Sequence, residues 1–196
     1  MMTDNERTTP RVGFWEATVR GFKGVLDFEG RARRSEFWWY ILAVYLLLCL
    51  LLIGVMSYIV ASGNYVKGHD YVGTFSWLDT LLMLSATFLP YALCFSIQVR
   101  RLHDVGEGAL WPCISFVTAF FTMLFWAIGI ESIISGVDWF AVTDNFLADL
   151  LVLVGYISWM LFLIAQIIII VNSLKDSQAH PNKYGDSPKY IVMIKH

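Results

Sequence analysis

The sequence predicts an all-α membrane protein with four transmembrane helices, both termini in the cytoplasm, and an N-terminal amphipathic helix at the membrane interface. The first observation is composition, because 57% of the 196 residues are hydrophobic and only 15% are charged. The second is the presence of four continuous apolar runs, each near the ~20 residues that a helix needs to cross roughly 30 Å of hydrocarbon. A soluble domain of this length cannot bury four such runs.

The N-terminal region divides into two parts. Residues 1–10 are expected to form a disordered N-terminus, and residues 11–36 a cytoplasmic amphipathic segment. Within that segment apolar residues recur at helical spacing, namely Phe14, Trp15, Val19, Phe22, Val25 and Leu26. Because Arg11, Arg20 and Lys23 add positive charge, the pattern predicts a helix on the inner leaflet over Arg11 to Asp27. Packing beneath the bundle and binding of a partner protein are the alternatives.

Four spans follow, at about residues 37–60, 77–99, 110–130 and 147–172, within a transmembrane domain of residues 37–174. The first and third contain no charged residue. Asp79 and Asp149 lie near the ends of the second and fourth, where a carboxylate can reach water. The runs do not alternate as strands of an outer-membrane barrel do, so helices are predicted. Residues 175–196 are predicted to be a cytoplasmic tail.

Orientation follows from the distribution of Lys and Arg, because basic flanks stay in the cytoplasm. The N-terminal segment, the loop around Arg100 and the tail together hold thirteen of the 14 basic residues. The other two connections hold only Lys67, and they carry the acidic residues Asp70, Glu131, Asp138 and Asp144. The sequence therefore predicts a multi-pass protein of the bacterial inner membrane, with the first span acting as an uncleaved signal anchor.

Cysteine usage and known motifs give no sign of a cofactor or of catalysis. Cys49, Cys94 and Cys113 lie in or at the edge of the spans, and no pair has metal-ligand spacing. The chain has no Walker loop, no dinucleotide-binding glycine fingerprint and no HExxH helix. We therefore expect no disulfide, metal, cofactor or nucleic-acid partner.

Mildly polar residues form stripes along three spans. The second span carries Thr80, Thr87, Tyr91, Cys94 and Gln98, the third Ser115, Thr118 and Thr122, and the fourth Gly155, Trp159, Gln166 and Ser173. Such stripes serve either helix packing or a polar path for a solute. Packing is favoured, because ion carriers place ionisable groups deep in the membrane. Pro90 is expected to bend the second span.

Three short segments on the predicted cytoplasmic side carry a resemblance to a known family. They are residues 28–38 (FEGRARRSEFW), residues 100–106 (RRLHDVG) and residues 182–188 (NKYGDSP). In this order they resemble the YhaH/YhaI-like bacterial inner-membrane proteins, a domain-of-unknown-function family (DUF805), over about Phe14 to Pro188. The resemblance implies a four-helix inner-membrane domain without an established activity. The acidic connection around residues 131–149 departs from the shorter members.

These segments supply the candidate site, a composite cytoplasmic surface. Its residues are Gly30, Arg31, Arg33, Arg34, Glu36, Arg100, Arg101, His103, Asp104, Asn182, Tyr184 and Gly185. The tail is expected to fold back so that Tyr184 contacts residues 100–108 or residues 30–36, with a disordered tail as the alternative. Glu36, Asp104 and Asp186 are expected to pair with the arginines.

Three functions remain open. The leading hypothesis is a non-enzymatic module whose basic cytoplasmic face binds anionic lipid headgroups or a protein partner, with homo-oligomerisation as a further expectation. The runner-up is a small transporter or channel built from the polar stripes. The third is a membrane enzyme that uses His103 and Asp104, which is disfavoured because no nucleophile or metal set accompanies them.

Overall fold

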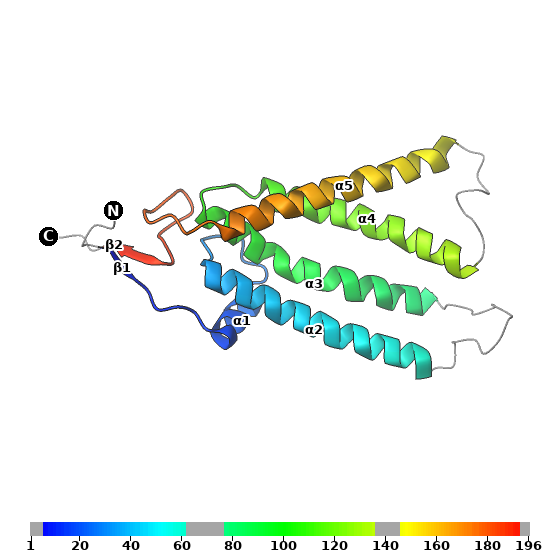
Figure 1. Cartoon of the computed structure of the whole chain (residues 1–196), viewed down its shortest axis with the longest axis horizontal. Helices are drawn as coiled ribbons and strands as arrows, with labels where there is room; N and C mark the ends of the chain where they lie inside the picture. The colour runs from blue at the N-terminus through cyan, green and yellow to red at the C-terminus, as the bar shows by residue number, and fades with distance from the viewer. Residues whose placement is uncertain (1–5, 62–76, 136–145, 193–196) are drawn as a thin grey trace. The chain divides into compact units, whose positions relative to one another are not determined.

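The computed structural model describes residues 6–61, 77–135 and 146–192 (Figure 1). Over these ranges the chain forms five helices and a two-stranded sheet. The helices are α1 (Phe14–Lys23), α2 (Arg34–Ala61), α3 (Trp77–Asp104), α4 (Leu110–Ser135) and α5 (Phe146–Leu174), and the strands are β1 (Glu6–Thr8) and β2 (Tyr190–Val192). The helical character of all four apolar runs and of the amphipathic segment is therefore confirmed.

Two of the long helices have clear membrane-spanning character. In the described chain, Arg34–Tyr58 and Val152–Leu174 are long and apolar enough to cross a bilayer, and Leu110–Phe125 is a shorter apolar helix. In the 18-residue apolar windows of the two longer segments, only 11% and 22% is buried. Because a core helix of a soluble protein would be mostly buried, these exposed apolar surfaces are typical of lipid-facing helices. The count of four spans stays a prediction.

The chain divides into two compact units. The cap comprises Met1–Tyr45, Leu93–Ile114 and Ala165–His196, and the helical unit comprises Leu46–Ala92 and Ser115–Ile164. The cap thus combines segments that are far apart in the sequence. All the residues of the candidate site belong to it.

In the cap, α1 packs closely on the beginning of α2. Gly21 is buried in α1, and a Cβ atom there would lie 2.0 Å from the Tyr40 ring, so only glycine permits this approach. The Phe22 and Tyr40 rings pack edge to face, with centroids 5.4 Å apart, as do Phe14 and Trp39 at 5.8 Å. The helix ends at Lys23, and the N–H of the C-cap residue Gly24 donates to the Arg20 carbonyl at 3.0 Å. These contacts hold α1 beside the first turns of α2.

Helix α3 ends in a Schellman motif, which fixes the turn that follows Asp104. Gly106 has φ +86°, its N–H donates to the His103 carbonyl at 3.1 Å, and the Glu107 N–H donates to the Leu102 carbonyl at 2.9 Å. Glycine is preferred at this left-handed position because it has no Cβ atom. The turn leaves the last residues of α3 facing the tail.

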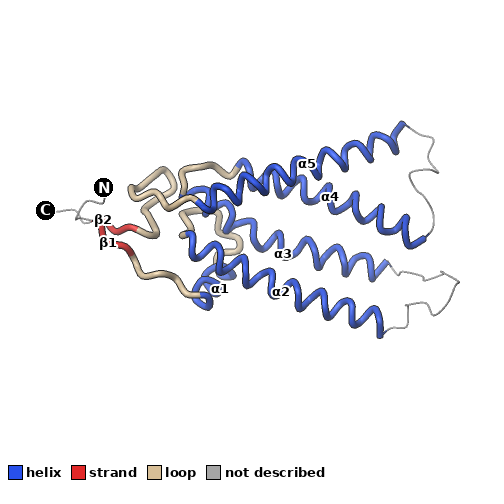
Figure 2. The backbone as a smooth tube through the Cα atoms, in the orientation of Figure 1, coloured by secondary structure: helices blue, strands red, loops and turns tan. Residues whose placement is uncertain are grey.

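The two strands require a correction to the predicted N-terminus. Residues 1–10 were expected to be disordered, but β1 pairs antiparallel with β2, with Glu6 opposite Val192 and Thr8 opposite Tyr190 (Figure 2). Thr9 extends the pairing, since its N–H donates to the Lys189 carbonyl at 2.9 Å. The expectation is wrong for residues 6–10, because the tail supplies hydrogen-bond partners that the local sequence does not reveal. Residues 1–5 lie outside the described chain.

In the helical unit, Tyr91 and Ser115 of the polar stripes take part in helix packing. The Tyr91 and Ser115 hydroxyl groups are hydrogen-bonded, and the Thr118 hydroxyl donates to the Ser115 carbonyl at 3.2 Å. The Tyr91 ring packs against Phe162 of α5, with centroids 5.8 Å apart. The contacts of Tyr91 join α3 to α4 and α5, whereas the Thr118 hydrogen bond lies within α4. The side chains of Thr80 and Thr87 lie outside the described residues.

Candidate functional site

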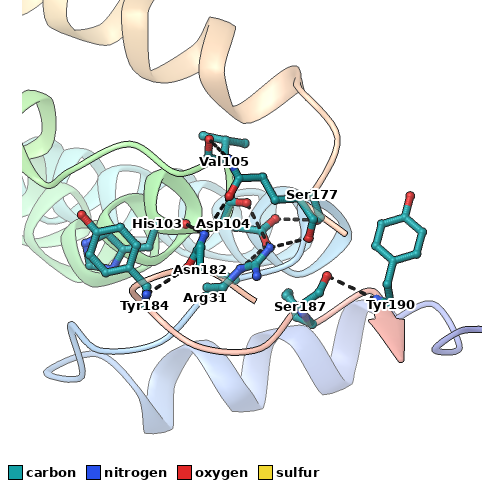
Figure 3. Close-up of polar contacts among 12 residues, drawn as sticks. Arg31, His103, Asp104, Val105, Ser177, Asn182, Tyr184, Ser187 and Tyr190 are labelled. Carbon is teal, nitrogen blue, oxygen red and sulfur yellow. Dashed lines mark hydrogen bonds and ion pairs between the residues drawn. The ribbon is translucent and has the colours of Figure 1, made fainter. Parts of the chain in front are cut away.

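Asp104, the last residue of α3, lies at the centre of the candidate site. Its side chain is fully buried. The carboxylate accepts a hydrogen bond from Nε of Arg31 at 3.0 Å and another from the Ser177 hydroxyl (Figure 3). It also accepts one from Arg101. Burial raises the pKa of the Asp104 carboxyl, and the Ser177 hydroxyl with the guanidinium groups of Arg101 and Arg31 acts against that rise. Three separate chain segments therefore meet on one carboxylate.

Arg31 uses its whole guanidinium group inside the cap. Besides the Asp104 carboxylate, it donates to the backbone carbonyls of Asp104 (3.2 Å), Gln178 (2.6 Å), His180 (3.1 Å) and Gly185 (3.2 Å). Its side chain is 1% exposed. Because a guanidinium has five N–H groups, these acceptors account for every donor. Arg31 thereby fastens the tail to the end of α3.

Arg101 is bound in a similar way on the other side of Asp104. Besides the carboxylate, it donates to the carbonyls of Ser173 (3.1 and 3.3 Å), Ala32 (3.5 Å) and Lys175. The last carbonyls of a helix lack intrahelical partners and carry partial negative charge. Those at the end of α5 therefore give a buried cation both acceptors and a favourable field. We call Arg31, Arg101, Asp104 and Ser177 the Asp104 clamp.

The tail packs on His103 through an aromatic stack. The Tyr184 and His103 ring centroids lie 3.6 Å apart at an interplanar angle of 6°, which confirms the predicted contact of Tyr184 with residues 100–108. Asn182 shapes this turn: its amide nitrogen donates to the His103 carbonyl at 3.0 Å, and its amide oxygen accepts the Tyr184 N–H at 2.9 Å. Gly185 closes the turn at φ +118°. The folded-back tail is thus present.

The pKa of His103 is lowered in the folded protein. Burial lowers its pKa and Lys183 adds to this effect, while the hydrogen bond to the Gly30 carbonyl opposes it. Nδ1 lies 3.2 Å from that carbonyl oxygen, so it carries the proton. The described contacts of the imidazole are with Gly30 and Tyr184, whereas Asp104 engages the arginines. The sequence neighbours His103 and Asp104 therefore do not form a hydrogen-bonded catalytic pair here.

The remaining basic residues of the candidate site have fewer internal partners. Arg33 donates through one terminal nitrogen to the Thr9 and Pro10 carbonyls, at 2.9 and 2.7 Å. Arg34 is exposed, with a single long contact of 3.4 Å to the Leu174 carbonyl. Arg100 reaches the Gly24 carbonyl at 3.4 Å. Arg33 and Arg100 are buried and Arg34 is exposed, a difference that their spacing in the sequence does not predict.

The candidate residues come together as expected, but much of the group is interior rather than surface. Arg33, Glu36, Arg100, Arg101, His103 and Asp104 are all buried. For Arg31 and Arg101 the physical reason is that Asp104 and the free carbonyls supply acceptors for their guanidinium groups, whereas Nε of Arg100 is buried without a described hydrogen-bond partner. Of the three expected carboxylates, Asp104 pairs with arginines. Burial raises the pKa of the Glu36 carboxyl, and the nearby Arg100 acts against that rise. Among the described residues no arginine forms an ion pair with Glu36 or Asp186.

Sequence reasoning missed several partners in this cluster. Ser177 and Gln178 contribute a hydroxyl and a backbone carbonyl to it, and Thr9 receives Arg33. The sequence feature connected with Gln178 is the glycine at position 106, because a Cβ atom there would lie 2.4 Å from the Gln178 amide nitrogen. In the described chain no group of three His, Cys, Asp or Glu side chains is placed to hold a metal ion.

Comparison with known proteins gives one family and no fold relative. The family described as "Protein of unknown function (DUF805)" matches residues 25–186. Inner membrane protein YhaH of Escherichia coli K12 is 26% identical over 99 residues, which cover 50% of this chain and 71% of YhaH. Inner membrane protein YhaI of the same organism is 29% identical over 103 residues, covering 53% and 71%. No solved structure matches.

Proposed function

The chain belongs to the DUF805 family, and from this premise we propose that it is a non-enzymatic inner-membrane module whose cap faces the cytoplasm and binds anionic lipid headgroups through α1. The observation that carries the proposal is an apolar face of α1 that the cap leaves exposed. On this face Trp15 is 75% and Phe22 is 40% exposed. The opposite face, with Ala17 and Gly21, is buried against α2.

The geometry of α1 supports a place at the membrane interface. Residues 15, 19 and 22 lie within about 60° of one another on a helix with 3.6 residues per turn. Because Phe14 and Phe22 pack on Trp39 and Tyr40, the helix lies level with the first turns of the apolar helix α2. An apolar helix face at that level fits the boundary between headgroups and acyl chains.

Charge on α1 selects the lipid. Arg20 and Lys23 occupy the last turn beside the apolar face, and both are exposed. Arg20 pairs with Glu16 at 2.6 Å, a contact more than half exposed to solvent and therefore weak. A basic residue near an anionic leaflet gains about 1 kcal/mol. The cytoplasmic leaflet offers acyl chains to the apolar face of α1 and anionic headgroups to Arg20 and Lys23.

The test measures lipid retained by the full-length protein. Purified in mild detergent from membranes that contain phosphatidylethanolamine and phosphatidylglycerol, the wild type should retain phosphatidylglycerol preferentially, as counted by native mass spectrometry. The Arg20→Gln, Lys23→Gln double variant should lose up to about 2 kcal/mol of this preference. The matched control is Lys175→Gln, Lys183→Gln, which removes the same charge from exposed tail positions. Equal retention by both double variants would overturn the proposal.

The orientation of the cap has its own test. Reporter domains fused before residue 1 and after residue 196 should both score cytoplasmic, and one inserted near Gly68 should score external. The expected orientation rests on the thirteen basic residues on one side of the predicted spans. A periplasmic C-terminus would contradict both the four-span count and the placement of the cap.

A further inference from the structure

A second feature of the cap is a pocket that shares no residue with the exposed face of α1. It encloses about 420 Å³ and lies beside the beginning of α2. Four of its lining residues are basic, namely Arg11, Arg33, Arg34 and Lys189, and one is acidic, Asp176. Asp176 already forms a salt bridge with Lys189 and accepts the Tyr190 hydroxyl at 3.2 Å. The three arginines therefore leave the pocket with a net positive charge.

The arginines that line this pocket have fewer hydrogen-bond acceptors within the protein than Arg31 and Arg101 of the Asp104 clamp. The described contacts of Arg33 all involve Nη1, those of Arg34 are limited to one at 3.4 Å, and none is described for Arg11. The Ser35 hydroxyl, which also lines the pocket, is buried and has no hydrogen-bond partner among the described residues. A buried polar group without a partner is uncommon in folded proteins and calls for an explanation. A ligand with several oxygen acceptors would satisfy the hydroxyl and the free guanidinium nitrogens together.

The beginning of α2 adds to the same field. Arg34 and Ser35 are its first two residues, and the N–H groups of a first helical turn have no intrahelical acceptors. The positive end of the helix dipole also points there. Helix N-termini with these properties bind phosphate groups, and arginine matches phosphate oxygens in a bidentate way. The pocket thus combines three sources of affinity for an anion, namely the arginines, the buried Ser35 hydroxyl and the N-terminus of α2.

We propose that this pocket, formed by Arg11, Arg33, Arg34, Lys189 and Ser35 at the N-terminus of α2, binds the phosphate group of a phosphate ester. A volume of about 420 Å³ leaves room for an organic group beside the phosphate. Trp38, one turn further along α2, supplies an apolar wall for that group. The ester is either a lipid headgroup or a soluble metabolite. The inference goes beyond the proposed lipid contact of α1.

The experiment has two arms that distinguish the sources. In the first, the full-length protein in detergent is titrated with inorganic phosphate and with glycerol 3-phosphate at constant ionic strength, and thermal unfolding is followed. In the second, the protein is placed in nanodiscs of phosphatidylethanolamine alone or with phosphatidylglycerol. A ligand that binds only the folded protein raises its unfolding temperature. A rise in the first arm assigns a soluble ester, and a rise in the second arm alone assigns a lipid.

Two variants connect the signal to the pocket. Arg11→Gln, Arg34→Gln changes exposed side chains with few internal contacts, so the fold should persist while affinity falls at least tenfold. Ser35→Ala leaves the charge unchanged and should weaken binding about two- to tenfold through one lost hydrogen bond. Lys175→Gln, Lys183→Gln is the charge-matched control and should bind as the wild type. No stabilisation in either arm, or wild-type affinity in both pocket variants, would overturn the proposal.

Discussion

Two pairs of basic residues in the cap have equal charge and opposite surroundings. Arg31 and Arg101 are buried, and their guanidinium groups are engaged by Asp104 and backbone carbonyls. Arg20 and Lys23 on α1 are exposed, and the described ion pair of Arg20 is a weak one with Glu16. The comparison teaches that positive charge alone does not identify a lipid-binding residue. What distinguishes the pairs is whether their donors already have acceptors inside the protein.

The largest expected effect comes from the shared carboxylate of the clamp. Asp104→Asn preserves size but leaves two buried guanidinium groups without their counter-charge. Removing one partner of a buried ion pair costs about 3–5 kcal/mol, so the unfolding temperature of the full-length protein in detergent should fall sharply. Asp186→Asn makes the same chemical change at an exposed position and should be nearly neutral. Similar unfolding temperatures for the two variants would mean that Arg31 and Arg101 do not depend on Asp104, and would contradict the proposed difference between this pair and the pair on α1.

A smaller loss of stability is expected from a change in the turn that follows α3. Gly106→Ala places a Cβ atom 2.4 Å from the Gln178 amide nitrogen at φ +86°, which combines backbone strain with displacement of the Gln178 side chain. We expect it to cost about 1–3 kcal/mol. Gly30→Ala has a similar φ of +76° but no atom within 4 Å, so it tests the backbone contribution alone. Thermal unfolding should rank Gly106→Ala below Gly30→Ala, and the reverse order would argue against the contact with Gln178.

The stack of Tyr184 on His103 should contribute less again. Tyr184→Ala removes a ring contact worth about 0.5–1.5 kcal/mol, while Tyr184→Phe keeps the ring. Hydrogen exchange should show faster amide exchange in residues 177–187 for the alanine variant alone. Equal exchange in the two variants would mean that the hydrogen bonds of Asn182 and Arg31 suffice to hold the tail.

The smallest effect is a pH dependence that arises from His103. Its pKa is lowered in the folded protein, so the unfolded chain takes up the proton first as the pH falls. The contribution of His103 to the free energy of unfolding is therefore fully present above the ordinary histidine pKa of about 6.5, and it declines as the pH falls below that value. Unfolding temperatures at pH 7.5 and pH 5.5 should differ more for the wild type than for His103→Gln. An equal difference would assign the dependence to other groups.

The sequence predicts the helices well because each apolar run carries its own signal. The periodicity of residues 14–22 is enough to predict α1, and the glycine after His103–Asp104 is enough to predict a turn. The sequence also predicts the contact of Tyr184 with residues 100–108. The burial of Arg31 and Arg101 is not predictable, because it depends on carbonyls of residues 173–185 whose position is set only by folding. The pairing of β1 with β2 escapes prediction for the same reason.

The proposed function depends most directly on how deeply the exposed face of α1 enters the membrane. In a variant with Cys49→Ser, Cys94→Ala and Cys113→Ser, a nitroxide label on Trp15→Cys can be placed by its accessibility to oxygen and to an aqueous nickel complex. A label on Asp186→Cys, in the exposed part of the tail, gives the aqueous reference. In nanodiscs containing phosphatidylglycerol, the label at position 15 should lie at the boundary between headgroups and acyl chains. Aqueous accessibility at position 15 equal to that at position 186 would contradict the account.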